Sequence, residues 1–289
     1  MLQKNLFVKL LALLLFKSKG GVLNNYYSLI SPKEYKIRRD IKSEDRVDRL
    51  IGLISPVPVE SNLIRIGSKD DGGYFIPEHD LAKIDYLISG GIENNNDFEI
   101  ELANLGVKGL QIDNSIEAPP RFHSNLTFKN ATIGILGPNS FSINHHLSVL
   151  PSNNVLLKLD IEGYEKFAIT EIDSDCFSKI RCLVLEIHDV DLISQNSYWI
   201  LLEKMLLCIF DAGFLPCFVN PNNSTSAVII GGRAIPRNIE VTFTRRQFMK
   251  KVFSLSDLKY LKSLQSKNDD AFSSVNIDHI LLHHFLLPQ

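Results

Sequence analysis

The sequence contains few cysteines and no motif that would pair them. Of its 289 residues four are cysteines, and no two are spaced as CxxC: Cys176, Cys182, Cys208 and Cys217. This number is far below the density of a disulfide-stabilised scaffold, and the spacing does not match a structural zinc site. We therefore expect a reducing, cytoplasmic environment in which the thiols pack as small hydrophobic groups.

An excess of charge of either sign is also absent. The 31 lysines and arginines nearly balance the 33 aspartates and glutamates, which leaves a net charge of -2. Nucleic acids are bound largely through concentrated positive charge. The composition therefore argues against a nucleic-acid-binding protein.

The apolar run near the N-terminus is too short for a transmembrane helix. It begins at Leu6 and ends at Phe16, whereas a helix that spans a bilayer needs roughly 20 residues. Lysines interrupt and flank the run, and no convincing small-residue cleavage pattern follows it. Three interpretations stay open: an amphipathic or buried helix, peripheral contact with a membrane, and an export signal.

Strand patterns alternate with helical patterns from residue 84 onward. We expect strands at 85–89, 107–112, 126–134, 155–160, 183–187, 214–219, 227–230 and 240–244, and helices at 97–105, 143–150 and 197–212. Such alternation predicts a parallel sheet with crossover helices. Residues 63–66 and 74–76 flank a glycine-containing turn and predict a hairpin. We expect an α/β, doubly wound, Rossmann-like domain over residues 63–247, with a helical N-terminal extension (1–62) and a helical C-terminal segment (248–289).

Two of the expected strands end in ionisable side chains. Asp160 and Glu162 follow one apolar run, and Glu186 and His188 end the next. Because ligands of open α/β sheets bind at the carboxyl ends of the strands, we expect these four side chains at one rim. For Glu162 the alternative is to cap the helix that begins near Tyr164.

His188 is the candidate general base. An imidazole has an unperturbed pKa of about 6.5, and Glu186, two residues earlier on the same strand face, is placed to orient it. The alternative is a purely structural histidine. Asp160, Glu186 and His188 also offer ligands to a divalent ion, although nothing in their spacing requires a metal.

A glycine turn and an acidic residue suggest a nucleoside ligand. Gly90 and Gly91 follow the first strand of the alternating region, where a ligand can approach the backbone. The full dinucleotide fingerprint is missing, so a tight turn is the alternative. Asp113 ends the next strand about 20 residues later, where doubly wound sheets place an acceptor for ribose hydroxyls. A turn or cap role is the alternative for Asp113.

These stretches resemble the signature of FkbM-type methyltransferases, which use S-adenosylmethionine. The resemblance covers about residues 63–244 and rests on the segments 65–74, 89–99, 157–165, 183–188 and 236–243. Two features depart from the family pattern. The cofactor loop is rich in asparagine rather than glycine, and residues 220–223 keep paired asparagines without an upstream histidine.

The resemblance implies a seven-stranded methyltransferase sheet and methyl transfer to a hydroxyl oxygen of a sugar, glycan or other small metabolite. It implies catalysis by His188, Glu186 and Asp160. The implied cofactor-binding residues are Gly90, Gly91, Glu99, Asp113, Asp160 and Glu162, and the implied substrate or lid residues are Asp71, Gly72, Asn222 and Asn223.

Two other functions stay open. A nucleotide-sugar glycosyltransferase could use the Asp-x-Glu element to hold Mg or Mn on a diphosphate. A degenerate, non-catalytic protein could retain the same fold. The glycine turn and Asp113, both ahead of the carboxylates, favour the methyltransferase.

Overall fold

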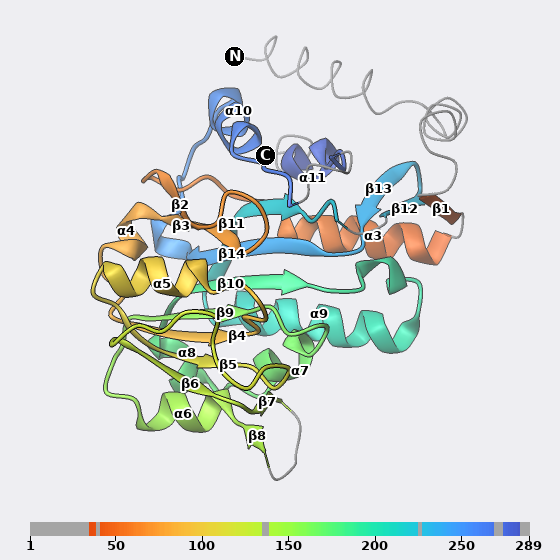
Figure 1. The fold of residues 1–289 in the computed structure, drawn as a ribbon. Helices are drawn as coiled ribbons and strands as arrows, with labels where there is room; N and C mark the ends of the chain where they lie inside the picture. Colours follow the sequence, from red (N-terminus) through yellow and green to blue (C-terminus); the bar gives the residue numbers. More distant parts are fainter. Residues whose placement is uncertain (1–34, 39–40, 135–138, 225–226, 269–273, 284–289) are drawn as a thin grey trace.

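The computed structural model describes residues 35–38, 41–134, 139–224, 227–268 and 274–283 (Figure 1). The apolar run that begins at Leu6 lies outside these ranges, so the expectations for it stay predictions. Within the described ranges, no helix combines the length and the apolar character that crossing a membrane requires.

A seven-stranded sheet forms the centre of the molecule, in the order β11-β14-β10-β9-β4-β5-β6. Neighbours from β10 to β6 run parallel, whereas β14 is antiparallel to both β10 and β11. This sheet confirms the expected fold class. Its strands are β4 (Tyr86–Gly90), β5 (Lys108–Ile112), β6 (Leu126–Lys129), β9 (Val155–Leu159), β10 (Ile180–Ile187), β11 (Phe214–Pro221) and β14 (Ile239–Arg245).

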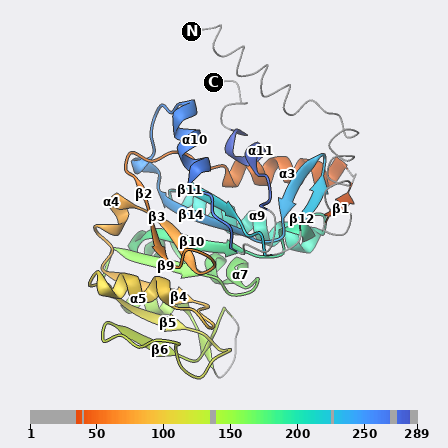
Figure 2. The ribbon, with the colours of Figure 1, turned by 45° about the horizontal axis from the view of Figure 1, so that its top comes forward.

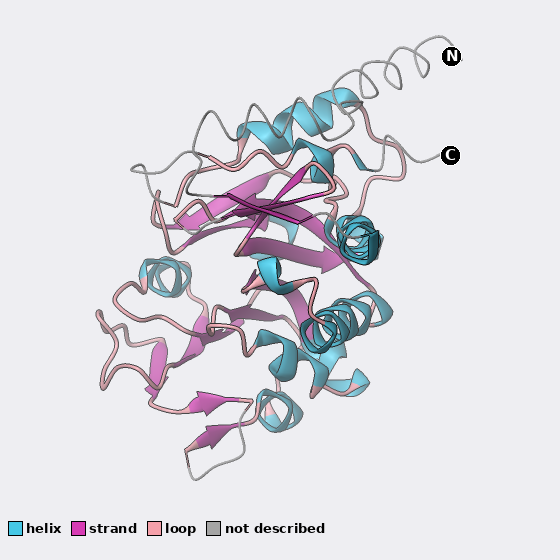
Figure 3. Cartoon of the chain, turned by 90° about the vertical axis from the view of Figure 1, so that its right-hand side faces the viewer, coloured by secondary structure: helices cyan, strands magenta, loops and turns pink. Residues whose placement is uncertain are grey.

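Both faces of the sheet are covered, as Figure 3 shows. Side chains alternate along each strand, so Leu157 packs on one face and Leu156 on the other. The first face packs against α3 (Ile41–Ile54), α6 (Ile143–Val149), α7 (Glu165–Thr170), α8 (Ser174–Lys179) and α9 (Asn196–Asp211). The second packs against α5 (Asp97–Asn104) and the expected hairpin, β2 (Leu63–Gly67) and β3 (Gly73–Pro77).

Two expected strands differ from the structure. The run at 126–134 is divided into β6 and β7 (Thr132–Ile133), because β7 pairs with β8 (Ser140–Phe141) in a small sheet of its own. The run at 227–230 forms β12 (Ala227–Ile230), which joins β1 (Tyr35–Arg38) and β13 (Arg233–Pro236) in a separate three-stranded sheet.

The first and last described helices lie along one side of the central sheet (Figure 2). Val47 and Ile54 of α3 are fully buried in the largest core cluster. Leu261 of α10 (Leu255–Ser263) packs in a cluster with Phe75 of the hairpin and Phe218 of β11. The short helices α4 (Glu78–Leu81) and α11 (Asp278–Leu281) complete the α-helices of the described part. The division of the chain at residues 62 and 247 stays a prediction.

Candidate active site

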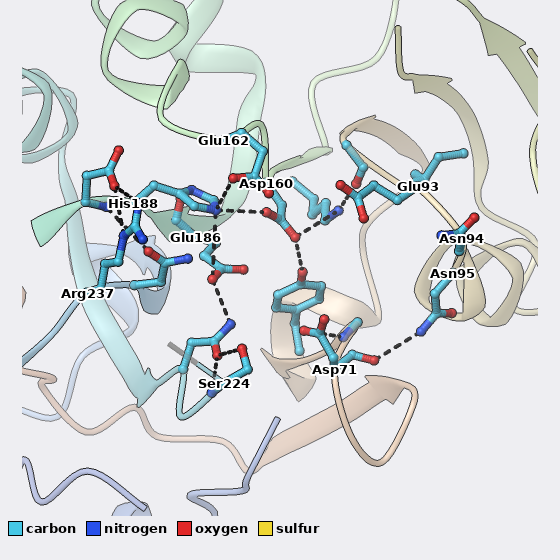
Figure 4. A pocket seen from close by; sticks show the side chains of 18 residues that line it. Asp71, Glu93, Asn94, Asn95, Asp160, Glu162, Glu186, His188, Ser224 and Arg237 are labelled. Carbon is cyan, nitrogen blue, oxygen red and sulfur yellow. Dashed lines mark hydrogen bonds and ion pairs between the residues drawn. The ribbon is translucent and has the colours of Figure 1, made fainter. Parts of the chain in front are cut away.

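The carboxyl ends of three adjacent strands meet at a cavity of about 430 Å³ (Figure 4). The last residues of β4 and β9 are register partners, and β10 pairs with β9 on the other side. Side chains that follow these strand ends therefore face a common space. The predicted site residues that line it are Asp71, Gly72, Gly91, Asp160, Glu162, Glu186, His188 and Asn222.

Three carboxylates surround the imidazole of His188. Its Nε2 atom lies 3.6 Å from Oδ1 of Asp160, 3.6 Å from Oε2 of Glu162 and 3.9 Å from Oε1 of Glu186. Figure 4 shows these side chains pointing toward one another. The structure thus brings together the four ionisable groups that the sequence places at the ends of two strands.

Glu165, rather than Glu186, orients the imidazole of His188. The Nδ1 atom of His188 donates to Oε1 of Glu165 at 2.9 Å. Glu165 is fully buried, and the same oxygen accepts the backbone amides of Ile161 and Gly163 at 3.1 Å each. Glu186, to which the sequence analysis assigned this role, contacts the ring through its carbonyl oxygen, 3.2 Å from Nδ1, and its carboxylate lies 3.9 Å from Nε2. Glu165 reaches Nδ1 because the turn at Gly163 brings the start of α7 beside the end of β10.

The charge state of His188 follows from these neighbours. Burial lowers the pKa of His188, but the hydrogen bond to Glu165 and the carboxylates of Glu165, Glu186 and Asp160 raise it to about 9. The ring is then protonated at neutral pH, so it acts as a base only after it gives up this proton. The predicted role of His188 as a simple general base needs that revision.

Glu186 belongs to a second pair of buried acids. It lies opposite Glu240 in the β10–β14 ladder and accepts a hydrogen bond from Nδ2 of Asn222 at 2.9 Å. Burial and the carboxylates of Asp160 and Glu240 raise the pKa of Glu186 well above its usual range. Burial also raises the pKa of Glu240 to about 7, against hydrogen bonds from Asn268 and Asn220. The sequence analysis missed Glu240, although it interrupts an apolar strand.

Asp160 is held by two residues that the sequence analysis did not select. The hydroxyl of Tyr74 donates to Oδ2 of Asp160 at 3.0 Å, and Nζ of Lys158 lies 3.9 Å from the same oxygen. Lys158 also contacts the carbonyl of Gly91 and lies over the ring of Tyr74. Lys158 shares a strand face with Asp160, so the two-residue period was a signal that could have found it.

A second cavity, of about 310 Å³, adjoins the first. The two share Gly91, Glu93, Asp160 and Glu162 as lining residues. The smaller cavity extends along the ends of β5 and β7, where Ile112 and other apolar residues, Ala131 and Ile133, line it together with Asp113. The smaller, partly apolar cavity therefore borders the larger, polar cavity around His188.

Asp113 fastens the loop that follows Gly91. Its Oδ2 atom accepts the amides of Ile92 and Glu93 at 2.8 and 2.9 Å, and its Oδ1 atom accepts the amide and the hydroxyl of Ser115 at 2.7 and 2.6 Å. Burial raises the pKa of Asp113, but these bonds hold it below its usual value. A carboxylate accepts about four hydrogen bonds, so Asp113 is occupied as a turn residue, which was the alternative to ribose binding.

The glycine turn serves the packing of strand ends. Gly91 has a φ of +77°, and a Cβ there would lie 1.6 Å from the carbonyl oxygen of Asp160. A Cβ at Gly90 would lie 2.5 Å from the side chain of Ile133. Gly91 lines both cavities, but its need for glycine is explained by the protein itself.

Three predicted site residues lie outside both cavities: Gly90, Glu99 and Asn223. Glu99 is buried, and its Oε1 accepts the hydroxyl of Ser89 at 2.5 Å. Asn223 accepts the amide of Asn268 at 2.7 Å and so holds the segment after α10. Neither side chain faces the space that a ligand would occupy.

Backbone strain gathers at the larger cavity. Among the described residues, three that are not glycine have a positive φ: Glu93 at 38°, Glu162 at 55° and Asp189 at 60°. All three line this cavity. Such conformations are rare for side-chain-bearing residues and are typical of functional sites.

Comparisons with known proteins give weak similarities. No protein-family model matches this chain, and no curated protein matches it. A fibrillarin pre-rRNA processing protein of Methanococcus jannaschii matches at 9% identity with a TM-score of 0.34, over 65% of this chain and 83% of its own. A proposed O-methyltransferase of Klebsiella pneumoniae matches at 6% identity with a TM-score of 0.30, over 80% of this chain and 99% of its own. WbdD matches at 11% identity with a TM-score of 0.29, over 78% of this chain and 47% of its own. The fold therefore rests on the observed sheet, and the function on the site.

Proposed function

We propose that this protein transfers a methyl group from S-adenosylmethionine to a hydroxyl oxygen of a sugar or another small polar metabolite. The observation that carries the proposal is the pair of adjoining cavities at the carboxyl edge of β4, β5, β9 and β10. The smaller cavity would take the adenosine half of the cofactor, and the larger one the acceptor. The resemblance to FkbM-type methyltransferases agrees with this arrangement.

The smaller cavity suits an adenine ring. Ile112 and Ile133 offer apolar contacts, and the ends of the first strands are where doubly wound sheets bind adenosine-type ligands. Asp113 is occupied by its own hydrogen bonds, so we assign the ribose hydroxyls to Glu93, which lines both cavities. The carboxylates of Asp160 and Glu162, at the shared border, would attract the positive sulfonium group.

The larger cavity suits an acceptor with several hydroxyl groups. Within the described part of the chain, Ile92 is its single aliphatic lining residue, and Tyr74 is the single lining residue of the Phe, Tyr and Trp group. Donors and acceptors of hydrogen bonds line the remainder, including Asn94, Asn95, Asn222, Ser224 and Asn238. A wall of this kind would bind an acceptor rich in hydroxyl groups better than it would bind an apolar or phenolic acceptor.

The chain's own residues would align the acceptor and take its proton. When bound, S-adenosylmethionine supplies the methyl group for an in-line displacement, so alignment is the main contribution of the protein. Glu165 fixes His188 through Nδ1, and Tyr74 fixes Asp160. Asp160 lines the same cavity and is the carboxylate to which we assign the hydroxyl proton.

A metal-dependent nucleotide-sugar glycosyltransferase is the second candidate. The observation that favours it is the group of possible metal ligands at Asp160, Glu186 and His188, whose ligand atoms all lie within 4.8 Å of one another. A diphosphate bound to such an ion would occupy the larger cavity. The smaller, partly apolar cavity beside it favours the methyltransferase, because a nucleoside base then has a site of its own.

Calorimetric titration tests the proposal. S-adenosylmethionine is expected to bind with micromolar affinity, and Glu93→Gln to weaken it about tenfold through loss of a charged hydrogen bond. Glu117→Gln is the matched control, because Glu117 is an exposed acid outside both cavities. Binding of a nucleotide sugar with Mn²⁺, and not of S-adenosylmethionine, would establish the glycosyltransferase instead. Binding of neither ligand would support a degenerate, non-catalytic protein.

A further inference from the structure

We propose that Asp160, Glu186 and His188 bind one hard divalent cation of the Mn²⁺ or Mg²⁺ class at the wall of the larger cavity. The cation site itself does not depend on which group the protein transfers. A role for the ion in holding the acceptor hydroxyl rests on the proposed function, since a cation lowers the pKa of a hydroxyl bound to it.

The distances between the three ligand atoms suit a shared ion better than they suit hydrogen bonds. Nε2 of His188 lies 3.6 Å from Oδ1 of Asp160 and 3.9 Å from Oε1 of Glu186, and all three side chains offer atoms within 4.8 Å of one another. Ligands at about 2.0–2.4 Å from an ion lie about 3–3.4 Å apart when adjacent and about 4–4.8 Å apart when opposite. The observed separations of 3.6 and 3.9 Å are slightly longer than those of adjacent ligands, so the side chains would close around an ion by a few tenths of an ångström.

Two atoms of the cluster have no hydrogen-bond partner within the described part of the chain. They are Nε2 of His188 and Oε2 of Glu186, and each of these residues is only 4% exposed. Neither atom is among the fully buried ones, and both residues line the cavity, so both atoms reach its space. An ion bound there would contact both atoms and would replace the proton on Nε2 of His188.

The residues behind the cluster hold the ligands as a metal site requires. The buried carboxylate of Glu165 accepts the Nδ1 proton of His188, and such carboxylate–histidine pairs commonly support metal-bound imidazoles. The hydroxyl of Tyr74 fixes Asp160, and the amide of Asn222 fixes Glu186. Each ligand is therefore already oriented by a neighbour that would not itself touch the ion.

The charge around the cavity calls for a cation. Six acidic residues line it, against three basic ones: Asp71, Glu93, Asp160, Glu162, Glu186 and Asp189, with Lys158, His188 and Arg237. Arg237 is already paired with Asp189 at 2.7 Å, and Lys158 contacts the carbonyl of Gly91. Two carboxylates and one imidazole favour Mn²⁺ or Mg²⁺ over the softer metals that thiolates bind.

Titration of Mn²⁺ into the full chain, without cofactor or acceptor, tests the site. Unbound Mn²⁺ is followed by its electron paramagnetic resonance signal. We expect one Mn²⁺ per chain, and Glu186→Gln should weaken its binding by at least about 30-fold because a ligand is lost. Glu240→Gln is the matched control: it removes a carboxylate opposite Glu186 in the ladder and should change the affinity less than about threefold.

Two results would overturn the proposal. One is the absence of stoichiometric Mn²⁺ binding to the wild-type chain. The other is an equal loss of Mn²⁺ affinity in both variants, which would mean that the ion is attracted only by the overall negative charge of the cavity. If Glu186→Gln does not fold, nuclear magnetic resonance of the wild-type chain decides. Mn²⁺ should broaden the imidazole signals of His188 before those of His79, which lines no part of this cavity. Since S-adenosylmethionine is absent throughout, failure of methyl transfer would not affect the outcome.

Discussion

Asp113 controls the shape of the border between the two cavities. Its carboxylate binds four donors, two of which are amides of the loop that follows Gly91. The loop carries Glu93, to which we assign ribose binding. Asp113 therefore acts on a ligand through the loop rather than by contact.

Asp113→Asn is expected to destabilise the unliganded protein. The N–H₂ group of an asparagine cannot accept hydrogen bonds, so two of the four donors would lose their acceptor. We expect this to lower the free energy of unfolding by roughly 1–3 kcal/mol. Urea unfolding without ligand measures this loss, with Glu117→Gln as the control. Unchanged stability together with a large loss of S-adenosylmethionine affinity would return Asp113 to the role of a ribose-binding residue.

The residues at the strand ends could be predicted from the sequence, whereas the hydrogen-bond partners that hold them could not. Asp160, Glu186 and His188 each end an apolar run, so the sheet brings them together whatever the details of the loops. Glu165 could not be placed in this way, because its contact with His188 depends on the tight turn at Gly163. The four donors of Asp113 likewise come from loops whose course no periodicity specifies.

At the scale of elements, the close approach of β4 and β9 is the feature that fixes the site. The turn at Gly91 lies against the backbone of Asp160, so the two strand ends that border both cavities are in direct contact. A side chain at position 91 would separate them.

Gly91→Ala should reduce the free energy of unfolding by roughly 2–5 kcal/mol, from overpacking and from an unfavourable positive φ together. Gly106→Ala is the matched control, because Gly106 also has a positive φ, at +95°, but no atom lies within 4 Å of the added Cβ. That variant should lose only roughly 1 kcal/mol. Equal losses for the two variants, measured by thermal unfolding, would show that packing against Asp160 does not require glycine.

The helix α4 is tied to the sheet by a buried acid that titrates. Asp80 is fully buried, accepts the hydroxyl of Thr244 and lies 3.0 Å from Arg181. Burial raises the pKa of Asp80 to about 6, although Thr244 and Arg181 act to lower it. The pKa of an aspartate in the unfolded chain is about 4, so Asp80 binds its proton more tightly in the folded state. Between about pH 4 and pH 6 the folded state therefore holds more protons than the unfolded one.

Stability should therefore fall as pH rises through this window, by an amount that Asp80→Asn removes. The full shift corresponds to about 3 kcal/mol between pH 4 and pH 7. Unfolding curves of both proteins at several pH values give the difference, in which the remaining titrating groups cancel. Curves that stay parallel over this range would contradict the account of Asp80.

At the scale of the whole molecule, alternation of strands and helices was enough to predict the central sheet. The additional sheet of β1, β12 and β13 was not predictable, because β1 and β12 are far apart in the sequence and pair only in the folded chain. The burial of α3 was hidden for a similar reason. Its apolar residues are spaced as on any amphipathic helix, and α9 and β11, which it packs against, come much later in the chain.

The molecule as a whole presents one binding edge, built where the carboxyl ends of the parallel strands meet. A crystal structure with S-adenosylhomocysteine tests this account most directly. We predict the adenine ring between Ile112 and Ile133, the ribose at Glu93 and the sulfur beside Gly91 and Asp160. An adenine ring in the larger cavity, or no bound ligand at saturating concentration, would contradict the account.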